Sequence, residues 1–289
     1  MYVKDIFEGE YENVDFWVYT ASDDEKYHVN KAKHKLYIPC DDSLGGTYEK
    51  TYKAFKLIEK LGLEYDYILR TNLSTYINVK LLSEFVNSDV IDDKHVYCGS
   101  VYCAKNATGP YEFCYYGCGN ALLLSKFWIN VITHNHVSKY RYNNFVFNPE
   151  EPYYKIDDNA IGLVINSYAL YNEMDMFDIW KNFKWQEPGS IPSDSNNYMA
   201  VSFREYNQEG TRDNEHRWGL AIHMCVKMND IVITPEQLLD NQEVHILDFE
   251  KGMHSLVSRE FADKFIGVMS LPKYIENLKI NNKKFNLMK

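Results

Sequence analysis

The chain has 289 residues, which is enough for a single large domain with a substantial hydrophobic core. Acidic residues number 41 against 31 lysines and arginines, and the net charge of −10 argues against general binding to a nucleic-acid backbone. A composition that is 45% hydrophobic and 25% charged is typical of a globular protein, not of a disordered chain or one embedded in a membrane.

The sequence contains no pattern of a membrane or secretory protein. Residues 1–15 are charged and lack the apolar run of a signal peptide. The longest apolar stretches, Ala121–Leu124 and Ile161–Ile165, are far shorter than the roughly 20 residues of a membrane-spanning helix. We therefore expect no transmembrane segment and a cytoplasmic protein, either in a bacterium or in a virus-infected host cell. No pattern indicates the oligomeric state.

Strands and helices are predicted to alternate in the N-terminal part of the chain. The apolar run 14–20 ends in polar residues and predicts a buried strand, and Leu36–Ile38 predicts a second strand. Apolar residues at helical spacing predict a helix over 48–61, and a strand follows at Tyr65–Arg70. Strand, helix and strand in this order are typical of an α/β sheet with helices on its faces.

The alternation continues with an amphipathic helix after Asn78 and strands near 95–103 and 111–116. Helices are predicted over about 125–133 and 157–171. The remaining predicted elements are a loop at 180–197, a strand near 199–204, a helix around 213–228, a strand near 243–248 and a surface helix at 272–289.

Polar or glycine-rich segments follow several of the predicted strands. In an α/β sheet, ligands bind at the C-terminal ends of the strands, so these segments are the first candidates for a site. The four candidate segments are Thr20-Ala21-Ser22-Asp23, Thr71-Asn72-Leu73-Ser74, Gly117-Cys118-Gly119-Asn120 and Asp157-Asp158.

Taken together, these segments resemble glycosyltransferases with the GT-A fold, specifically the family 31 group of β-1,3-galactosyl-, N-acetylglucosaminyl- and Fringe-like transferases. Lys50-Thr51 looks like the Lys-Thr pair in that family's helix before its metal-binding strand. Residues 67–79 resemble the family's strand Lys-Thr-Asp-Asp-Asp-Val-Phe-Val-Asn, and residues 117–125 resemble its Gly-Gly-Gly-Tyr-Val-Leu-Ser loop and helix. Residues 157–162 match its acid-Asp-x-x-x-Gly motif. The last third of the chain matches only loosely.

The resemblance implies an α/β fold with a GT-A-like mixed sheet and helices on both faces. It implies a catalytic domain over residues 1–240, with residues 241–289 as a C-terminal extension packed on the same domain. It also implies an inverting enzyme that transfers a monosaccharide from a nucleotide sugar, with a uridine diphosphate (UDP) sugar favoured, to a hydroxyl group of a glycan acceptor.

The two acids at 157 and 158 carry the chemistry that the resemblance implies. Asp158 would be the general base that deprotonates the acceptor hydroxyl, and Asp157 would orient that base or the acceptor. A cap at the start of a helix is the alternative role of either acid, and the two roles are compatible.

The other three segments are expected to bind the donor. Residues Thr20–Asp23 would hold the uracil and ribose, and Asn72–Ser74 would contact the ribose or the diphosphate. Gly117–Asn120 would line the donor sugar, because glycine lets backbone amides approach a ligand closely. A tight turn between a strand and a helix is the alternative for this glycine segment.

One departure from the family concerns the metal. Where the family has Asp-x-Asp carboxylates, this chain has Asn72-Leu73-Ser74, and neutral side chains bind a hard cation far more weakly. This leaves dependence on Mn²⁺ or Mg²⁺ open, and we assign no metal ligand. Carboxylates from other loops are the alternative ligands, namely Asp23, Asp24, Asp41 and Asp42, with His216 or His223 more distant.

A metal-free site needs fixed cations to neutralise the donor diphosphate. The candidates are Lys50, Arg70, Arg204, Arg212 and Arg217. Among them Arg204 and Arg212 are favoured, because a predicted strand and the following loop and helix start would place both on the same side of the sheet. Surface positions without a ligand are the alternative.

Two other classes of function remain open. A catalytically inactive protein that binds nucleotide sugars or glycans would keep the same residues and show no turnover. An unrelated α/β enzyme such as a hydrolase has less support, since the sequence contains no Gly-x-Ser-x-Gly elbow, Walker loop or Gly-x-Gly-x-x-Gly segment.

Overall fold

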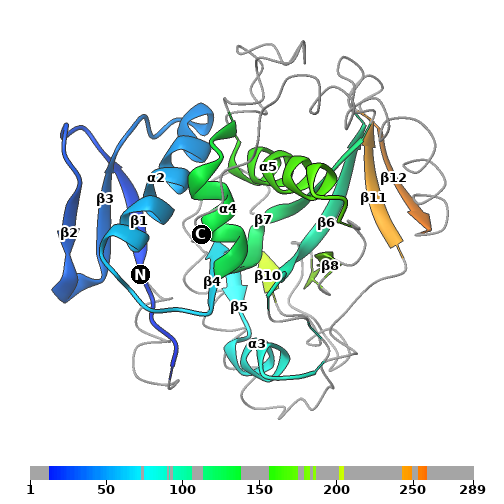
Figure 1. Cartoon of the computed structure of the whole chain (residues 1–289), viewed down its shortest axis with the longest axis horizontal. Coiled ribbons are helices and arrows are strands. Elements are labelled where there is room, and N and C mark those ends of the chain that lie inside the picture. The colour runs from blue at the N-terminus through cyan, green and yellow to red at the C-terminus, as the bar shows by residue number, and fades with distance from the viewer. Residues whose placement is uncertain are drawn as a thin grey trace.

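A computed structural model describes much of the first 182 residues and four short strands between residues 185 and 258 (Figure 1). The described residues are 13–72, 75–89, 91, 94–105, 113–137, 156–174, 179–182, 185–186, 202–204, 243–248 and 253–258. Among these residues, none of the helices is both long enough and apolar enough to span a bilayer. The predictions that lie outside the described residues are Leu73, Ser74, Arg212, Arg217, His216, His223 and the helices at 213–228 and 272–289.

Helices and strands alternate along the chain. The helices are α2 (Thr47–Lys60), α3 (Val79–Val86), α4 (Lys126–His134) and α5 (Asp157–Tyr171), with the short 3₁₀ turns η1 (Lys31–Lys33) and η2 (Leu44–Gly46). The first seven strands are β1 (Val18–Ser22), β2 (His28–Asn30), β3 (Lys35–Pro39), β4 (Tyr67–Thr71), β5 (Thr75–Ile77), β6 (Tyr97–Lys105) and β7 (Phe113–Ser125). The others are β8 (Trp180–Asn182), β9 (Trp185–Gln186), β10 (Ser202–Arg204), β11 (Glu243–Asp248) and β12 (Met253–Ser258).

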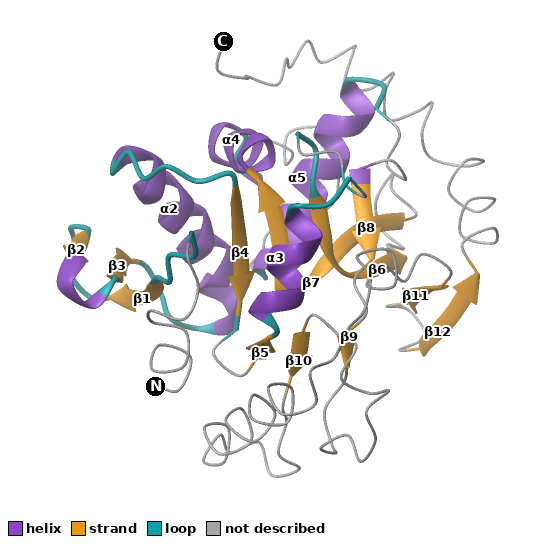
Figure 2. Ribbon diagram, turned by 90° about the horizontal axis from the view of Figure 1, so that it is seen from below, coloured by secondary structure: helices purple, strands orange, loops and turns teal. Residues whose placement is uncertain are grey.

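The described strands form three sheets, each with parallel and antiparallel pairs. The largest has the order β12-β11-β6-β7-β4, and β8 pairs with the free part of the β6 edge. A second sheet, β1-β3-β2, lies at the opposite end of the molecule from β11 and β12 in Figure 1. The third consists of the short strands β5, β10 and β9, which lie in a row in Figure 2. The fold is therefore mixed α/β, as the sequence predicts.

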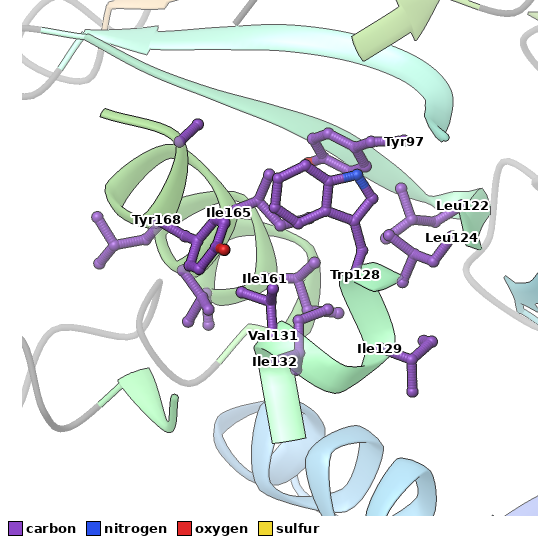
Figure 3. Close-up of a cluster of buried hydrophobic side chains, with 14 of the residues drawn as sticks. Tyr97, Leu122, Leu124, Trp128, Ile129, Val131, Ile132, Ile161, Ile165 and Tyr168 are labelled. Carbon is purple, nitrogen blue, oxygen red and sulfur yellow. The ribbon is translucent and has the colours of Figure 1, made fainter. Parts of the chain in front are cut away.

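Helices pack on both faces of the largest sheet. Leu122 and Leu124 of β7 belong to a core with α4 and α5, whereas Leu123 between them packs with α3. Successive side chains of a strand point to opposite faces, so α3 lies on one face and α4 and α5 on the other (Figure 1). The larger core surrounds Trp128, which lies against Tyr97 and the side chains of α5 in Figure 3.

Local sequence signals account for the helix boundaries. Asn78 caps α3, because its side chain accepts a hydrogen bond from the Leu81 N–H at 3.2 Å. The chain leaves α2 through Gly62, whose φ of +63° lies in the left-handed region that glycine adopts without steric cost. The helices predicted over 48–61 and 157–171 are confirmed as α2 and α5.

Three sequence-based expectations about strands were wrong. Residues 117–120 were expected to link a strand to a helix, but β7 continues to Ser125. The loop predicted over 180–197 contains β8 and β9, which are too short to produce a pattern of their own. The strand–helix–strand unit exists as β3, α2 and β4, but β3 and β4 belong to different sheets.

The core position of Trp128 gives a first testable prediction. Trp128 is fully buried, and its indole N–H donates to the His95 carbonyl at 3.0 Å. Trp128→Ala should therefore lower the free energy of unfolding by about 3–5 kcal/mol in urea denaturation. The exposed Val14 provides a control, and Val14→Ala should change stability by no more than about 0.5 kcal/mol. Equal stability of the two variants would contradict this position for Trp128.

Candidate functional site

The glycine segment of β7 forms a bulge. Along the pairing of β6 with β7, Gly99 lies opposite Leu122 and Val101 lies opposite Gly117. One residue of β6, Ser100, therefore faces the four residues 118–121 of β7. Bulges change the direction in which the side chains and backbone groups of a strand point, and they are over-represented next to active sites. The expected loop between a strand and a helix is thus replaced by a bulge inside the continuous strand β7.

Gly119 in this bulge contacts two charged side chains through its backbone. Its carbonyl accepts a hydrogen bond from Nη1 of Arg70, and its N–H donates to Oδ2 of Asp158 at 3.0 Å. A Cβ at this position would lie 2.5 Å from Arg70 Nη1 and 3.5 Å from Asp158 Oδ2. Close approach of the arginine therefore requires glycine here.

Arg70 and Asp157 form a buried ion pair. Nη2 of Arg70 contacts Oδ2 of Asp157, and their side chains are only 9% and 5% exposed. Arg70 Nε donates to the Tyr19 hydroxyl at 3.2 Å, and Thr51 Oγ1 donates to Asp157 Oδ2 at 2.9 Å. The hydroxyl oxygens of Tyr19 and Thr51 lie 3.0 Å apart. These bonds connect β1, α2, β4 and α5 in one closed network.

Tyr19 and Thr51 were not predicted to be site residues. Tyr19 directly precedes the segment Thr20–Asp23 that the sequence singled out. Thr51 occupies a core-facing position of the helical pattern, where its hydroxyl requires a hydrogen-bond partner. A polar atom on the apolar face of α2 was therefore the signal that could have identified Thr51.

The adjacent acids Asp157 and Asp158 occupy different environments. Asp158 is partly exposed, and its Oδ1 accepts hydrogen bonds from the backbone and side chain of Asn159 at 2.7 and 3.1 Å. Burial and the charge of Asp157 raise the pKa of Asp158, although the N–H groups of Gly119 and Asn159 oppose this shift. Two acids in distinct environments are typical of sites that divide acid–base roles.

The charge of Arg70 persists despite its burial. Burial acts to lower the pKa of this guanidinium, but the neighbouring oxygens of Tyr19 and Asp157 outweigh that effect and raise it. The guanidinium thus stays positive and neutralises Asp157.

Thr71 and Asn120 adjoin the network. Thr71 Oγ1 donates to the Asn120 carbonyl at 2.6 Å. The side-chain oxygen of Asn120 accepts from the Ala121 N–H at 2.9 Å, whereas its buried Nδ2 has no hydrogen-bond partner within the described part of the chain. Gly117 faces the core instead, because a Cβ there would lie 2.5 Å from Cδ1 of Leu122. Cys118 is partly exposed.

The predicted donor-binding residues of β1 lie on an edge strand of the β1-β3-β2 sheet, and Lys50 belongs to the adjoining helix α2. Ser22 at the end of β1 lies opposite Pro39 of the parallel strand β3. The Ser22 hydroxyl donates to Asp24 Oδ2 at 3.1 Å in the exposed turn that follows. Lys50 forms an ion pair with the exposed Asp42 in the loop after β3. Alternation along β1 places Ala21 on the same face as Tyr19, and Thr20 on the other.

The predicted strand near 199–204 is present as β10, where Arg204 pairs with Thr75 of β5. The Thr75 N–H donates to the Asn72 carbonyl at 3.0 Å, so the backbone of Arg204 lies near the end of β4. No group of three or more histidine, cysteine, aspartate or glutamate side chains suited to a metal occurs within the described ranges.

The site thus combines residues from three of the four predicted segments. Arg70, Gly119, Asp157 and Asp158 are in direct contact, and Thr71 and Asn120 adjoin them. No protein-family model and no curated protein matches the chain. The partly exposed Asp158 carboxylate, whose pKa is raised, lies beside the Asp157 carboxylate, which Arg70 neutralises. This arrangement suits proton transfer at Asp158.

The ion pair predicts a large loss of stability on removal of one partner. Asp157→Ala should lower the free energy of unfolding by about 3–5 kcal/mol, because Arg70 is then buried without its counter-charge. Thr51→Val removes the hydrogen bond to the same carboxylate and the one shared with the Tyr19 hydroxyl, and should cost less, about 1–2 kcal/mol. Urea denaturation measures both.

A paired substitution provides the control for this prediction. Arg70→Met combined with Asp157→Leu leaves no uncompensated charge and should be more stable than Asp157→Ala. If the double variant is as unstable as Asp157→Ala, the unpaired charge is not the cause of the loss.

Proposed function

We propose that the protein is an inverting glycosyltransferase that moves a monosaccharide from a UDP-sugar to a hydroxyl group of a glycan. The difference between the two acids at the start of α5 carries this proposal. Asp157 is neutralised by Arg70, whereas Asp158 is partly exposed and binds a proton more tightly than an ordinary aspartate. A general base needs this combination of access and proton affinity. The resemblance of the four sequence motifs supports the class of reaction.

In the proposed reaction, Asp158 accepts the proton of the acceptor hydroxyl while that oxygen attacks the anomeric carbon of the donor. The bond from the anomeric carbon to the diphosphate oxygen breaks on the opposite side, so the configuration inverts. UDP leaves with the electron pair of that bond. The N–H groups of Gly119 and Asn159 fix the two oxygens of Asp158 during proton transfer.

Asp157 and Arg70 have a positioning role in this proposal. Arg70 donates to Asp157, to Gly119 and to Tyr19, so its guanidinium is committed to groups of the protein. The donor diphosphate then requires other cations, and Lys50, Arg204 and Arg212 are the candidates that remain. The Lys50 side chain is 17% exposed, and its partner Asp42 is an exposed side chain whose place a phosphate can take.

One observation favours the alternative of a catalytically inactive protein that binds nucleotide sugars or glycans. Asn72, at the end of β4, stands where the family has a carboxylate that holds the metal. Such a protein would bind the donor and release no UDP, which distinguishes it from the transferase.

Donor binding provides the first test of the proposal. A ligand that binds only the native state raises the melting temperature, so nucleotides and nucleotide sugars can be compared by thermal unfolding with manganese and with a chelator. We expect a UDP-sugar to stabilise the protein equally under both conditions. A shift that needs manganese would show that a metal completes the site. The absence of a shift with every nucleotide would overturn the proposal.

The role of Asp158 predicts a pH dependence. Because burial and Asp157 raise its pKa, Asp158 loses its proton only at a higher pH than an ordinary aspartate, and the reaction rate should fall as the pH drops through that value. Asp158→Asn should reduce UDP release from the donor by about 10²- to 10⁴-fold while UDP still binds. The exposed Asp89 serves as the control, because Asp89→Asn should keep the full rate. Unchanged turnover in Asp158→Asn would exclude this base.

A further inference from the structure

The two oxygens of the Asp158 carboxylate are held unequally. Its Oδ1 accepts two hydrogen bonds from one residue, the backbone N–H of Asn159 at 2.7 Å and the side-chain Nδ2 of Asn159 at 3.1 Å. Its Oδ2 accepts one, from the Gly119 N–H at 3.0 Å. Each oxygen of a carboxylate can accept about two hydrogen bonds. Within the described residues, Oδ1 is therefore saturated, whereas Oδ2 can accept one more donor.

Arg70 does not occupy the open position on Oδ2. Its Nε donates to the Tyr19 hydroxyl, its Nη1 donates to the Gly119 carbonyl, and its Nη2 contacts Asp157. The charged groups that act on Asp158 are Asp157 on the same helix and Arg70 on β4, and Arg70 acts through its charge from this neighbouring position. The open position on Oδ2 is thus available to a group from outside the network.

The second hydrogen bond to Oδ1 depends on the identity of residue 159. Any residue except proline has a backbone N–H at this position, but the Nδ2 donor comes from the asparagine side chain. The amide must present its nitrogen to Oδ1, because its oxygen would repel the carboxylate. The acid-Asp-x-x-x-Gly motif leaves position 159 unspecified, so the family resemblance assigns no role to Asn159.

The amide of Asn159 also affects the protonation of Asp158. Burial and the charge of Asp157 raise the pKa of this carboxyl, and the N–H groups of Gly119 and Asn159 oppose the shift. A donor that binds the ionised form favours that form, so Nδ2 acts in the same direction as the two N–H groups. A general base must be ionised before it can accept a proton. Asn159 therefore increases the fraction of Asp158 that is ready to react at a given pH.

We propose that Asn159 is a positioning residue of the reaction, whose side-chain amide holds Oδ1 of Asp158 so that Oδ2 receives the proton of the acceptor. The inference rests on the proposed function, which supplies the acceptor hydroxyl. In this step the acceptor O–H bond breaks and its proton bonds to Oδ2, while the electron pair of the O–H bond stays on the attacking oxygen. Oδ1 becomes the carbonyl oxygen of the neutral acid and keeps both hydrogen bonds.

This assignment gives the side from which the acceptor approaches. Oδ2 is the oxygen that binds the Gly119 N–H in β7, whereas Oδ1 binds Asn159. The attacking hydroxyl therefore lies next to the β7 bulge when it gives up its proton. The bulge then borders the acceptor, in addition to holding Arg70 through the Gly119 carbonyl.

Carboxyl titration tests the role of Asn159 without any turnover. The measured quantity is the carbon-13 shift of the Asp158 carboxyl in protein labelled at aspartate, and the signal is identified by its loss in Asp158→Asn. Asn159→Leu keeps the approximate size of the side chain and the backbone N–H but removes the Nδ2 donor. We expect the titration midpoint of Asp158 to rise by about one pH unit, because the ionised form loses a hydrogen bond. An unchanged midpoint would overturn the inference.

Two further variants control for the substitution itself. Asn159→Ala removes the same donor without the bulk of leucine and should move the midpoint in the same direction. Asn172, directly after the last residue of α5, donates through its Nδ2 to the Tyr168 carbonyl at 2.8 Å. Asn172→Ala removes an equivalent bond at the other end of the helix and should leave the midpoint within about 0.2 pH units. An equal shift in Asn172→Ala would overturn the inference.

The pH dependence of UDP release distinguishes positioning from a merely structural role. In Asn159→Leu the rate should fall about tenfold below the wild-type midpoint and come within about threefold of the wild type well above the new midpoint. The KM for the donor should not change, because the amide binds the base and not the donor. An equal loss at every pH would overturn the inference. A rate at least about tenfold above the wild type at high pH would also overturn it, since the amide would then block the accepting oxygen.

The two measurements separate this inference from the proposed function. An unchanged midpoint together with normal UDP release would overturn the role of Asn159 and leave the transferase proposal standing. If no UDP-sugar is turned over, the transferase proposal fails, and with it the transfer of the acceptor proton to Oδ2. A raised midpoint in Asn159→Leu would in that case still support the hold of Asn159 on Oδ1.

Discussion

The buried ion pair between Arg70 and Asp157 is the interaction on which the site depends. Removing two charges from water is costly, and the cost is offset only when both ions are fully hydrogen-bonded. Tyr19, Thr51 and the Gly119 carbonyl provide those bonds. Because these groups come from segments far apart in the sequence, the ion pair forms only when the surrounding elements are correctly packed.

This dependence extends to Asp158. Its position is set on one side by the start of α5 and on the other by the Gly119 N–H in the bulge of β7. The bulge therefore holds both the arginine that neutralises one acid and the amide that fixes the other. Burial and the charge of Asp157 raise the pKa of Asp158, while the Gly119 N–H and the charge of Arg70 oppose that shift.

Sequence patterns predicted the parts of the fold that local interactions determine. Helix α2 followed from its apolar spacing, and the acids that begin α5 were recognised as a motif. The continuous strand β7 was not predicted, since residues 121–124 are buried on both faces and an apolar run without alternation has no strand period. The contacts of Tyr19 and Thr51 arise only when distant segments meet, so the sequence could indicate that the Thr51 hydroxyl needs a partner but not which residues provide it.

The tight fit of Arg70 against Gly119 has a consequence for the divergence of this chain. Losing either charge alone leaves the other buried, and adding any side chain at 119 displaces the guanidinium. A single substitution of Arg70, Gly119 or Asp157 is therefore disfavoured. Descendants of this sequence should keep all three residues or replace them together, so that the three positions vary as one unit while the surrounding surface drifts freely.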